Sequence, residues 1–202
     1  RSYMNSNLQP SSQVIQSTLS KNGFDADCYV EYEPYRCHIY SLPFTLNCIH
    51  WLTSRFPGGT FINVQTLSVF DLHHPFKPDF FAKISSSFPV LTKLKVWNNI
   101  EQLEKQSSSI IEFTHLSQLD IDHAHIDYVE QFLSNSNTYL PALNSLQVKY
   151  TDLAIVTNNF TRSETQINCS KLKTLFLEKQ IYLPHSKDFY QYFPQEIKIS
   201  FV

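Results

Sequence analysis

The chain has little glycine, with three in 202 residues. So few glycines leave no glycine-rich loop to cradle a phosphate, and no G-x-S-x-G turn presents a nucleophilic serine. We therefore expect a protein that is not an enzyme and that carries no cofactor. A hydrolase whose site is assembled only in space, in a deep pocket, is the least favoured alternative.

Cysteine is also sparse and carries no motif. The four cysteines show no C-x-x-C pair and no close cluster, which argues against a zinc site and against a disulfide-bonded cap. We expect buried free thiols in a reducing compartment, and hence an intracellular protein. The residues concerned are Cys28, Cys37, Cys48 and Cys169.

Charge of one sign and long apolar runs are missing too. With 16 basic and 18 acidic residues the net charge is −2, so no global field attracts nucleic acid or an anionic membrane surface. The apolar runs are too short to span a membrane. Residues 1–5 lack the apolar segment of a signal peptide, but the only methionine is Met4, so we expect the natural start to lie outside this sequence.

What the chain does have is a repeat. The stretch from Leu91 to Asn99 has apolar residues at Leu91, Leu94 and Val96 and ends on asparagine, as in the strand and turn of a leucine-rich repeat. The central leucines of five such stretches are spaced by 25 to 29 residues, inside the range of this repeat class. The other copies are Val64/Leu67/Val69, Leu116/Leu119/Ile121, Leu143/Leu146/Val148 and Leu172/Leu175/Leu177, with a looser one at Ile197/Ile199/Phe201.

Between the strands we expect helices. Proline and capping residues predict helices over residues 10–23, 43–56 and 78–88, and a further helix from about Asp127, which is a suitable cap. Thr151 and Ser186 suit the caps of two shorter helices. Residues 29–42 are rich in β-branched and aromatic residues and are predicted to form the first strand, whereas residues 98–113 indicate an irregular connection.

Stacked units of this kind form an α/β leucine-rich-repeat solenoid, with a curved parallel sheet on the concave side and helices and turns on the convex side. We expect an N-terminal capping helix and linker over residues 1–28 and a single leucine-rich-repeat domain over residues 29–202. The final strand would be an exposed edge, and a monomer is the expected state.

Side-chain alternation along each strand predicts three rows of outward residues across the sheet. They are Thr66/Lys93/Gln118/Ser145/Thr174, Ser68/Lys95/Asp120/Gln147/Phe176 and Phe70/Trp97/Asp122/Lys149/Glu178. Phe70 and Trp97 would lie side by side next to a ladder of alternating charges, which is the composition of a protein-binding hot spot. The alternative is that Leu72 and Ile100, in the loops that follow, cover these two rings. The candidate partner-binding residues are Phe70, Lys95, Trp97, Asp120, Asp122, Lys149, Phe176 and Glu178.

Residues 120–127 alternate aspartate and histidine and resemble a metal-binding run. However, Ile121 must face the core while Asp120 and Asp122 face outward, so three converging ligands are not expected. We interpret His123 and His125 as turn residues and Asp127 as a helix cap, and His73 and His74 as loop residues. No metal site is predicted.

Three segments resemble the leucine-rich region of F-box-type proteins, over about residues 29–202. They are residues 56–59, residues 80–94 with Phe80-Phe81 and Phe88-Pro89, and residues 127–133. In that family an N-terminal F-box docks on the adaptor of a cullin ubiquitin ligase, and the repeats select the substrate. The residues before Tyr29 are too few and too polar for an F-box. The resemblance therefore implies the substrate-recognition half of an SCF-type receptor, joined to its adaptor through an F-box outside this sequence.

We thus expect a module that binds a protein ligand or ubiquitination substrate on its concave surface. The alternative is a fragment of a secreted or cell-surface repeat receptor. Asn159 and Asn168 each begin an N-glycosylation pattern, so occupied glycan sites and paired cysteines would favour that alternative.

Overall fold

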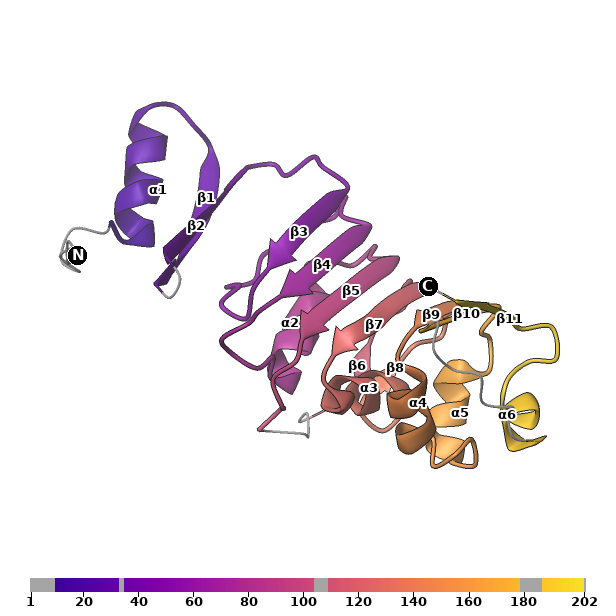
Figure 1. Ribbon diagram of the computed structural model, residues 1–202. Helices are drawn as coiled ribbons and strands as arrows, with labels where there is room; N and C mark the ends of the chain where they lie inside the picture. The colour runs from indigo at the N-terminus through magenta and orange to yellow at the C-terminus, as the bar shows by residue number, and fades with distance from the viewer. Residues whose placement is uncertain (1–9, 33–34, 104–108, 179–186, 202) are drawn as a thin grey trace. The chain divides into compact units, whose positions relative to one another are not determined.

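The computed structural model describes residues 10–32, 35–103, 109–178 and 187–201, and the chain divides into two compact units (Figure 1). Unit 1 comprises residues 1–45 with 55–57, and unit 2 comprises residues 46–54 with 58–202. The predicted boundary after residue 28 lies within β1 (Ala26–Tyr32), the first strand of unit 1.

Unit 1 consists of a helix and a β-hairpin. The helix α1 (Ser12–Lys21) confirms the prediction for residues 10–23: the Ser11 side chain accepts a hydrogen bond from the Val14 N–H at 3.4 Å. Gly23 follows with φ of +78°, a left-handed conformation that glycine adopts without strain. The strands β1 (Ala26–Tyr32) and β2 (Tyr35–Ser41) pair antiparallel.

This hairpin overturns the prediction that residues 29–42 form the first strand of the parallel sheet. Tyr29 pairs with His38 in the hairpin, and their rings stack with centroids 4.4 Å apart. Phe56 packs edge-on against Tyr29 at 6.3 Å. The residues are strand formers, as predicted, but the antiparallel partner lies next to them in the chain, and residue spacing alone does not reveal the partner.

Unit 2 is built on a seven-stranded sheet in which every pair of neighbours is parallel. Leu67, Leu94, Leu119, Leu146 and Leu175 occupy one register row, followed by Ile199, which confirms the repeat spacing. The order is β11-β10-β9-β7-β5-β4-β3, with β3 (Cys48–Leu52), β4 (Thr66–Phe70), β5 (Lys93–Asn98), β7 (Gln118–Ala124), β9 (Ser145–Gln147), β10 (Thr174–Leu177) and β11 (Lys198–Phe201).

The helix predicted over residues 43–56 is wrong, because this segment contains the edge strand β3. The apolar residues Cys48, Ile49 and Leu52 fit a helical spacing, but pairing with β4 overrides it. Leu52 lies opposite Val69, and both side chains are buried.

Helices cover one face of this sheet (Figure 1). The predicted helix over residues 78–88 is α2 (Pro78–Ser87), and the helix predicted from Asp127 is α3 (Ile126–Leu133). Two short helices predicted near Thr151 and Ser186 are α4 (Tyr150–Val156) and α6 (Lys187–Tyr192), and α5 (Ser163–Cys169) was not predicted. The connections contain a short parallel pair, β6 (Ile111–Glu112) with β8 (Thr138–Tyr139).

The caps predicted at Asp127 and Thr151 are wrong. His125, not Asp127, caps α3, because its Nδ1 accepts a hydrogen bond from the Asp127 N–H at 3.3 Å. Lys149 stands at the cap of α4, and Thr151 lies within the helix. Ser186 lies outside the described residues.

Phenylalanine and tyrosine fill the space between α2, α3 and the sheet. Phe81 is fully buried and meets Phe132 at 4.9 Å and Tyr128 at 6.0 Å between ring centroids. The Tyr128 hydroxyl accepts a hydrogen bond from the Phe76 N–H at 2.9 Å, which satisfies a backbone donor inside the core. Burial raises the pKa of Tyr128, so its hydroxyl stays neutral.

The turns after β4 and β5 are held by buried polar side chains. Asn98, and not Asn99 as predicted, holds the turn after β5: its Nδ2 donates to the His74 carbonyl at 2.8 Å, and its Oδ1 accepts from the Ile100 N–H at 2.9 Å. Asp71 directly follows β4 and corresponds in position to Asn98 at the end of β5. It accepts hydrogen bonds from the His73 and His74 N–H groups, each at 2.9 Å. Burial opposes ionisation of Asp71, but these hydrogen bonds and that from Ser54 outweigh it and lower its pKa.

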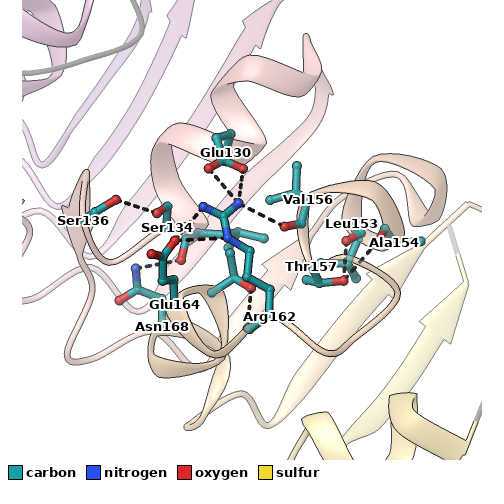
Figure 2. Close-up of polar contacts among 12 residues, drawn as sticks. Glu130, Ser134, Ser136, Leu153, Ala154, Val156, Thr157, Arg162, Glu164 and Asn168 are labelled. Atoms are coloured by element: carbon teal, nitrogen blue, oxygen red, sulfur yellow. Dashed lines mark hydrogen bonds and ion pairs between the residues drawn. The ribbon is translucent and has the colours of Figure 1, made fainter.

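Asn168 of α5 plays a similar role on the helical side (Figure 2). Its side chain is 2% exposed and makes four hydrogen bonds. Oδ1 accepts from the Leu140 N–H at 3.0 Å, and Nδ2 donates to the carbonyls of Phe132, Leu133 and Thr138 at 3.1, 3.2 and 2.7 Å. This asparagine is thus a core residue of the fold, whereas Asn159 is exposed.

All four cysteines are free, but the expectation of burial holds for only two of them. Cys28 and Cys169 are buried, Cys37 is exposed and Cys48 is half-buried. Burial raises the pKa of the Cys169 thiol to about 12, so this thiol stays protonated and unreactive at neutral pH.

The connection from α4 to α5 contains three successive left-handed residues, Asn158, Asn159 and Phe160, with φ of 50°, 52° and 68°. A left-handed conformation costs roughly 1–2 kcal/mol for a residue with a side chain, although asparagine tolerates it better. The turn places the Phe160 ring in the core, 4.9 Å from Phe189. Aromatic burial of this kind offsets the strain.

Arg162, just after that turn, joins α3 to α5 (Figure 2). Its Nη1 lies 2.8 Å from both carboxylate oxygens of Glu130, and its Nη2 lies 2.6 Å from Glu164 Oε2. The hydrogen bond with Glu164, against a smaller opposing effect of burial, and the pairing with Glu130 raise the pKa of the guanidinium. These contacts tie α3 to α5 through Glu130 and Arg162, which lie 32 positions apart in the sequence.

Replacing Arg162 with methionine, which keeps part of the aliphatic stem, is expected to lower the free energy of unfolding by about 1 kcal/mol, since these charges are partly exposed. Urea denaturation at low salt and at 1 M NaCl would measure the free energy of unfolding. Its difference from wild type should be smaller at 1 M NaCl, because salt screens the ion pairs. Lys171→Met, which removes a charge outside these ion pairs, is the control. Equal losses at both salt concentrations would contradict the electrostatic explanation.

Candidate functional site

The face of the sheet opposite the helices carries the outward side chains in rows across the strands. Two predicted rows are confirmed: Thr66, Lys93, Gln118, Ser145 and Thr174 are in register, and so are Ser68, Lys95, Asp120, Gln147 and Phe176. Lys198 continues the first row on β11. This face belongs entirely to unit 2.

The predicted third row is only partly correct. Phe70 pairs with Trp97, as expected, but an irregularity in β7 pairs Trp97 with His123 instead of Asp122. Asp122 is consequently 8% exposed, and its Oδ1 has no hydrogen-bond partner among the described residues. A β-bulge moves every later side chain to the opposite face, which the repeat spacing does not reveal.

The last two members of the predicted charge ladder leave the sheet. Lys149 lies after β9 as the cap residue of α4, and Glu178 is exposed just beyond the end of β10. The alternating ladder of Asp122, Lys149 and Glu178 is therefore not formed as a row of the sheet. Phe176 lies on β10 in the second row, as predicted.

A second irregularity, in β3, presents a residue that sequence reasoning missed. Ile49 pairs with Leu67 and Leu52 with Val69, so two residues of β3, His50 and Trp51, lie opposite one residue of β4. Trp51 has φ of +65°, and its N–H donates to the Ser68 hydroxyl at 3.1 Å. The ring is 52% exposed. A left-handed tryptophan is a true conformational outlier, and such outliers gather at functional sites.

Trp51, Phe70, Trp97 and His123 form an aromatic cluster across four neighbouring strands. The Trp51 and Phe70 rings meet edge-on at 5.1 Å, Phe70 and Trp97 edge-on at 5.7 Å, and Trp97 stacks on His123 at 4.5 Å. Phe70 and Trp97 are half-buried. Leu72, predicted to cover Phe70 in the alternative interpretation, is 57% exposed.

Lysine and aspartate lie beside this aromatic cluster. Lys95 Nζ is 2.7 Å from Asp120 Oδ2 and 5.9 Å from the centre of the Trp97 ring, so its charge is shared between a carboxylate and an aromatic face. Lys93, two residues before Lys95 on the same face of β5, is exposed and forms no ion pair with any residue that the structure describes.

Together these side chains line an open groove of about 510 Å³, which lies within the size range of ligand-binding pockets. His50 and Ser68 lie in it with Nδ1 and Oγ 3.3 Å apart, but no carboxylate of the described chain orients His50, so no triad is assembled. The groove is lined by His50, Trp51, Thr66, Leu67, Ser68, Val69, Phe70, Lys93, Leu94, Lys95, Trp97, Gln118, Leu119, Asp120, Ser145, Gln147 and Phe176.

The run of aspartates and histidines over residues 120–127 is used in separate ways. Asp120 pairs with Lys95, His123 stacks on Trp97 and His125 caps α3. His123 therefore belongs to β7 and the aromatic cluster, not to a turn as predicted. Within the described ranges, no three histidine, cysteine, aspartate or glutamate side chains converge as a metal site would require.

Phe70, Lys95, Trp97, Asp120 and Phe176 are the predicted residues that the structure brings to this groove. His50 and Trp51 were missed, whereas Lys93 was predicted to face outward but was not among the binding candidates. The repeat spacing could not locate Trp51, because Ile49 precedes its partner Leu67 by far less than one repeat. A tryptophan within the short run Cys48–Leu52 is the one signal that was present.

None of the helices in the described ranges is long and apolar enough to cross a membrane. Comparisons with protein-family models, with curated proteins and with solved structures find no match for this chain.

Proposed function

We propose that unit 2 is a leucine-rich-repeat solenoid and that its exposed sheet face binds a protein partner. The regular register of the leucine row and the helices on the other face support this architecture. Binding at the sheet face is supported by the groove and by the aromatic cluster, since tryptophan and other aromatics dominate binding hot spots.

The observation that carries the proposal is Trp51. A half-exposed tryptophan in a left-handed backbone reduces stability in two ways, through strain and through apolar exposure. The core needs neither the strained backbone nor the exposed ring, because Leu52 already fills the buried position of β3. A binding surface accounts for both.

The resemblance to F-box-type proteins extends this to a more specific proposal, in which the bound partner is a ubiquitination substrate and the chain is intracellular. Four free cysteines agree with a reducing compartment. The burial of Asn168 argues against one of the two glycan sites of the secreted alternative, because a glycan on Asn168 is incompatible with its four hydrogen bonds.

The test is affinity capture from source-cell lysate with the wild-type chain and with a double variant, Lys95→Glu with Trp97→Ala. We expect the wild type to retain a defined protein and the double variant to recover about tenfold less, because both changes fall in the groove. The recovered proteins are identified by mass spectrometry.

Ile155→Ala is the control, because Ile155 is 67% exposed on α4, away from the groove. Thermal unfolding of all three proteins shows that each is folded. Equal recovery of the same partners by the wild type and the double variant would contradict the assignment of the binding face.

A further inference from the structure

The two sides of the groove differ in chemistry. Trp51, Phe70 and Trp97 form an aromatic wall where β3, β4 and β5 end, while Lys93 and Lys95 lie toward the beginning of β5. The one carboxylate in the lining, Asp120, is paired with Lys95. The groove therefore has an excess positive charge in a chain whose net charge is −2.

We propose that the groove takes an extended peptide segment of the partner, in which an acidic side chain lies two to four residues from a bulky apolar one. The acidic group pairs with Lys93, and the apolar side chain packs against Trp51, Phe70 and Trp97. This inference rests on the proposed function and adds the chemistry of the partner to it.

Lys93 is the residue that selects an anion. Its side chain is exposed, it lines the groove, and it has no ion pair within the described part of the chain. Its neighbours in the row are the uncharged Thr66 and Gln118. A carboxylate from a partner would therefore meet an unshared ammonium group, flanked by amide and hydroxyl hydrogen-bond donors.

The aromatic wall does not form a cage for a cation. The three rings pack directly against one another at 5.1 to 6.4 Å, which leaves no gap between them. Lys95 already lies over Trp97, so a second cation there would be repelled. An uncharged apolar side chain has no such conflict, and it gains the free energy of burying the exposed part of Trp51.

The spacing of the two groups follows from strand geometry. Lys93 and Trp97 lie four residues apart on one face of β5, roughly 13 Å between their backbones. The long lysine side chain shortens the distance that the ligand must span. An extended segment covers it when its acidic and apolar side chains lie two to four positions apart.

A nucleic acid is the less suitable ligand. Such ligands bind to stripes of basic residues that neutralise several phosphates, whereas this groove offers one lysine that is not already paired. The experiment distinguishes the two classes directly.

The test is selection of a phage-displayed library of random 12-residue peptides on the wild-type chain and, separately, on Lys93→Glu. On the wild type we expect enrichment of aspartate or glutamate two to four positions from leucine, phenylalanine or tryptophan. On Lys93→Glu the acidic preference should vanish or turn basic. No enrichment, enrichment without acidic residues, or the same preference on both proteins would overturn the proposal.

Tryptophan fluorescence provides a local readout, because Trp51 and Trp97 are the only two tryptophans and both line the groove. A synthetic peptide from the selection should change the emission and bind Lys93→Glu about tenfold more weakly than wild type. Lys171→Glu, the same charge reversal outside the groove lining, should bind like wild type. Single-stranded DNA of twelve nucleotides is titrated in parallel, and binding as tight as that of the peptide would overturn the proposal.

Failure of this inference and failure of the proposed function give different results. If Trp51→Ala abolishes partner capture while Lys93→Glu leaves it unchanged, the face binds a partner but not through an acidic segment. If neither change affects capture, the binding face itself is wrong.

Discussion

Replacing Asn168 with aspartate is expected to lower the free energy of unfolding by at least about 3 kcal/mol at pH 7. The substitution keeps the shape of the side chain and keeps the acceptor for the Leu140 N–H. It replaces the amide donor with a carboxylate oxygen that faces the carbonyls of Phe132, Leu133 and Thr138, which lie 2.7 to 3.2 Å from Nδ2. The new charge is buried and meets oxygen atoms instead of donors.

The pH dependence follows from the same geometry. Burial and three facing carbonyls favour the protonated acid, so the folded-state pKa of the introduced carboxyl lies above its unfolded value of about 3.9. The loss in free energy of unfolding relative to wild type is therefore largest at pH values above the folded-state pKa. Between the folded-state and unfolded-state pKa values, this loss decreases by about 1.4 kcal/mol for each unit by which the pH falls. Asn168→Ala, which has no titrating group, should show a deficit that does not change with pH.

Urea denaturation of wild type, Asn168→Asp and Asn168→Ala at pH 7 and pH 5 measures these differences. Asn159→Asp is the matched control, because Asn159 is the other asparagine in a glycosylation pattern but is exposed. Its stability should stay within about 0.5 kcal/mol of wild type. A deficit below about 1 kcal/mol for Asn168→Asp, or one that does not depend on pH, would show that the buried hydrogen bonds are not as described.

Replacing Trp51 with alanine is expected to weaken partner binding about 30-fold or more, the effect of truncating a central aromatic hot spot. Trp51→Gly should weaken it equally, because neither variant retains the ring. The two variants should differ in stability. At φ of +65° glycine is unstrained and alanine is not, so the glycine variant should be more stable by about 1 kcal/mol.

This order of stability is the reverse of the order at an ordinary strand position, where glycine is less stable than alanine by about 0.5–1 kcal/mol. Leu72→Ala and Leu72→Gly provide the comparison for an exposed residue beside the same sheet. Partner binding is measured by titration against the captured protein, and stability by urea denaturation. If Trp51→Ala binds as tightly as wild type, Trp51 is not the anchor, and if it is more stable than Trp51→Gly, the left-handed backbone is not retained.

The repeating part of this protein could be predicted from its amino-acid sequence. Leucine spacing and side-chain alternation predicted five strands of the parallel sheet, their register and the outward positions of Lys95, Asp120 and Phe176. These features follow from local periodicity, because each repeat buries its apolar side chains in the same way. Proline and capping patterns likewise located α1 and α2.

The positions where that periodicity is broken depend on contacts between strands. The bulge in β3 exposes Trp51, and the irregularity in β7 buries Asp122 and brings His123 beside Trp97. Pairing with the neighbouring strand decides each shift, and no residue on the shifted strand signals it. The hairpin of unit 1 and the hydrogen bonds of Asn168 depend on partners in the same way. The candidate site therefore combines outward residues of the regular strands with Trp51 and His123, which irregular pairing places beside them.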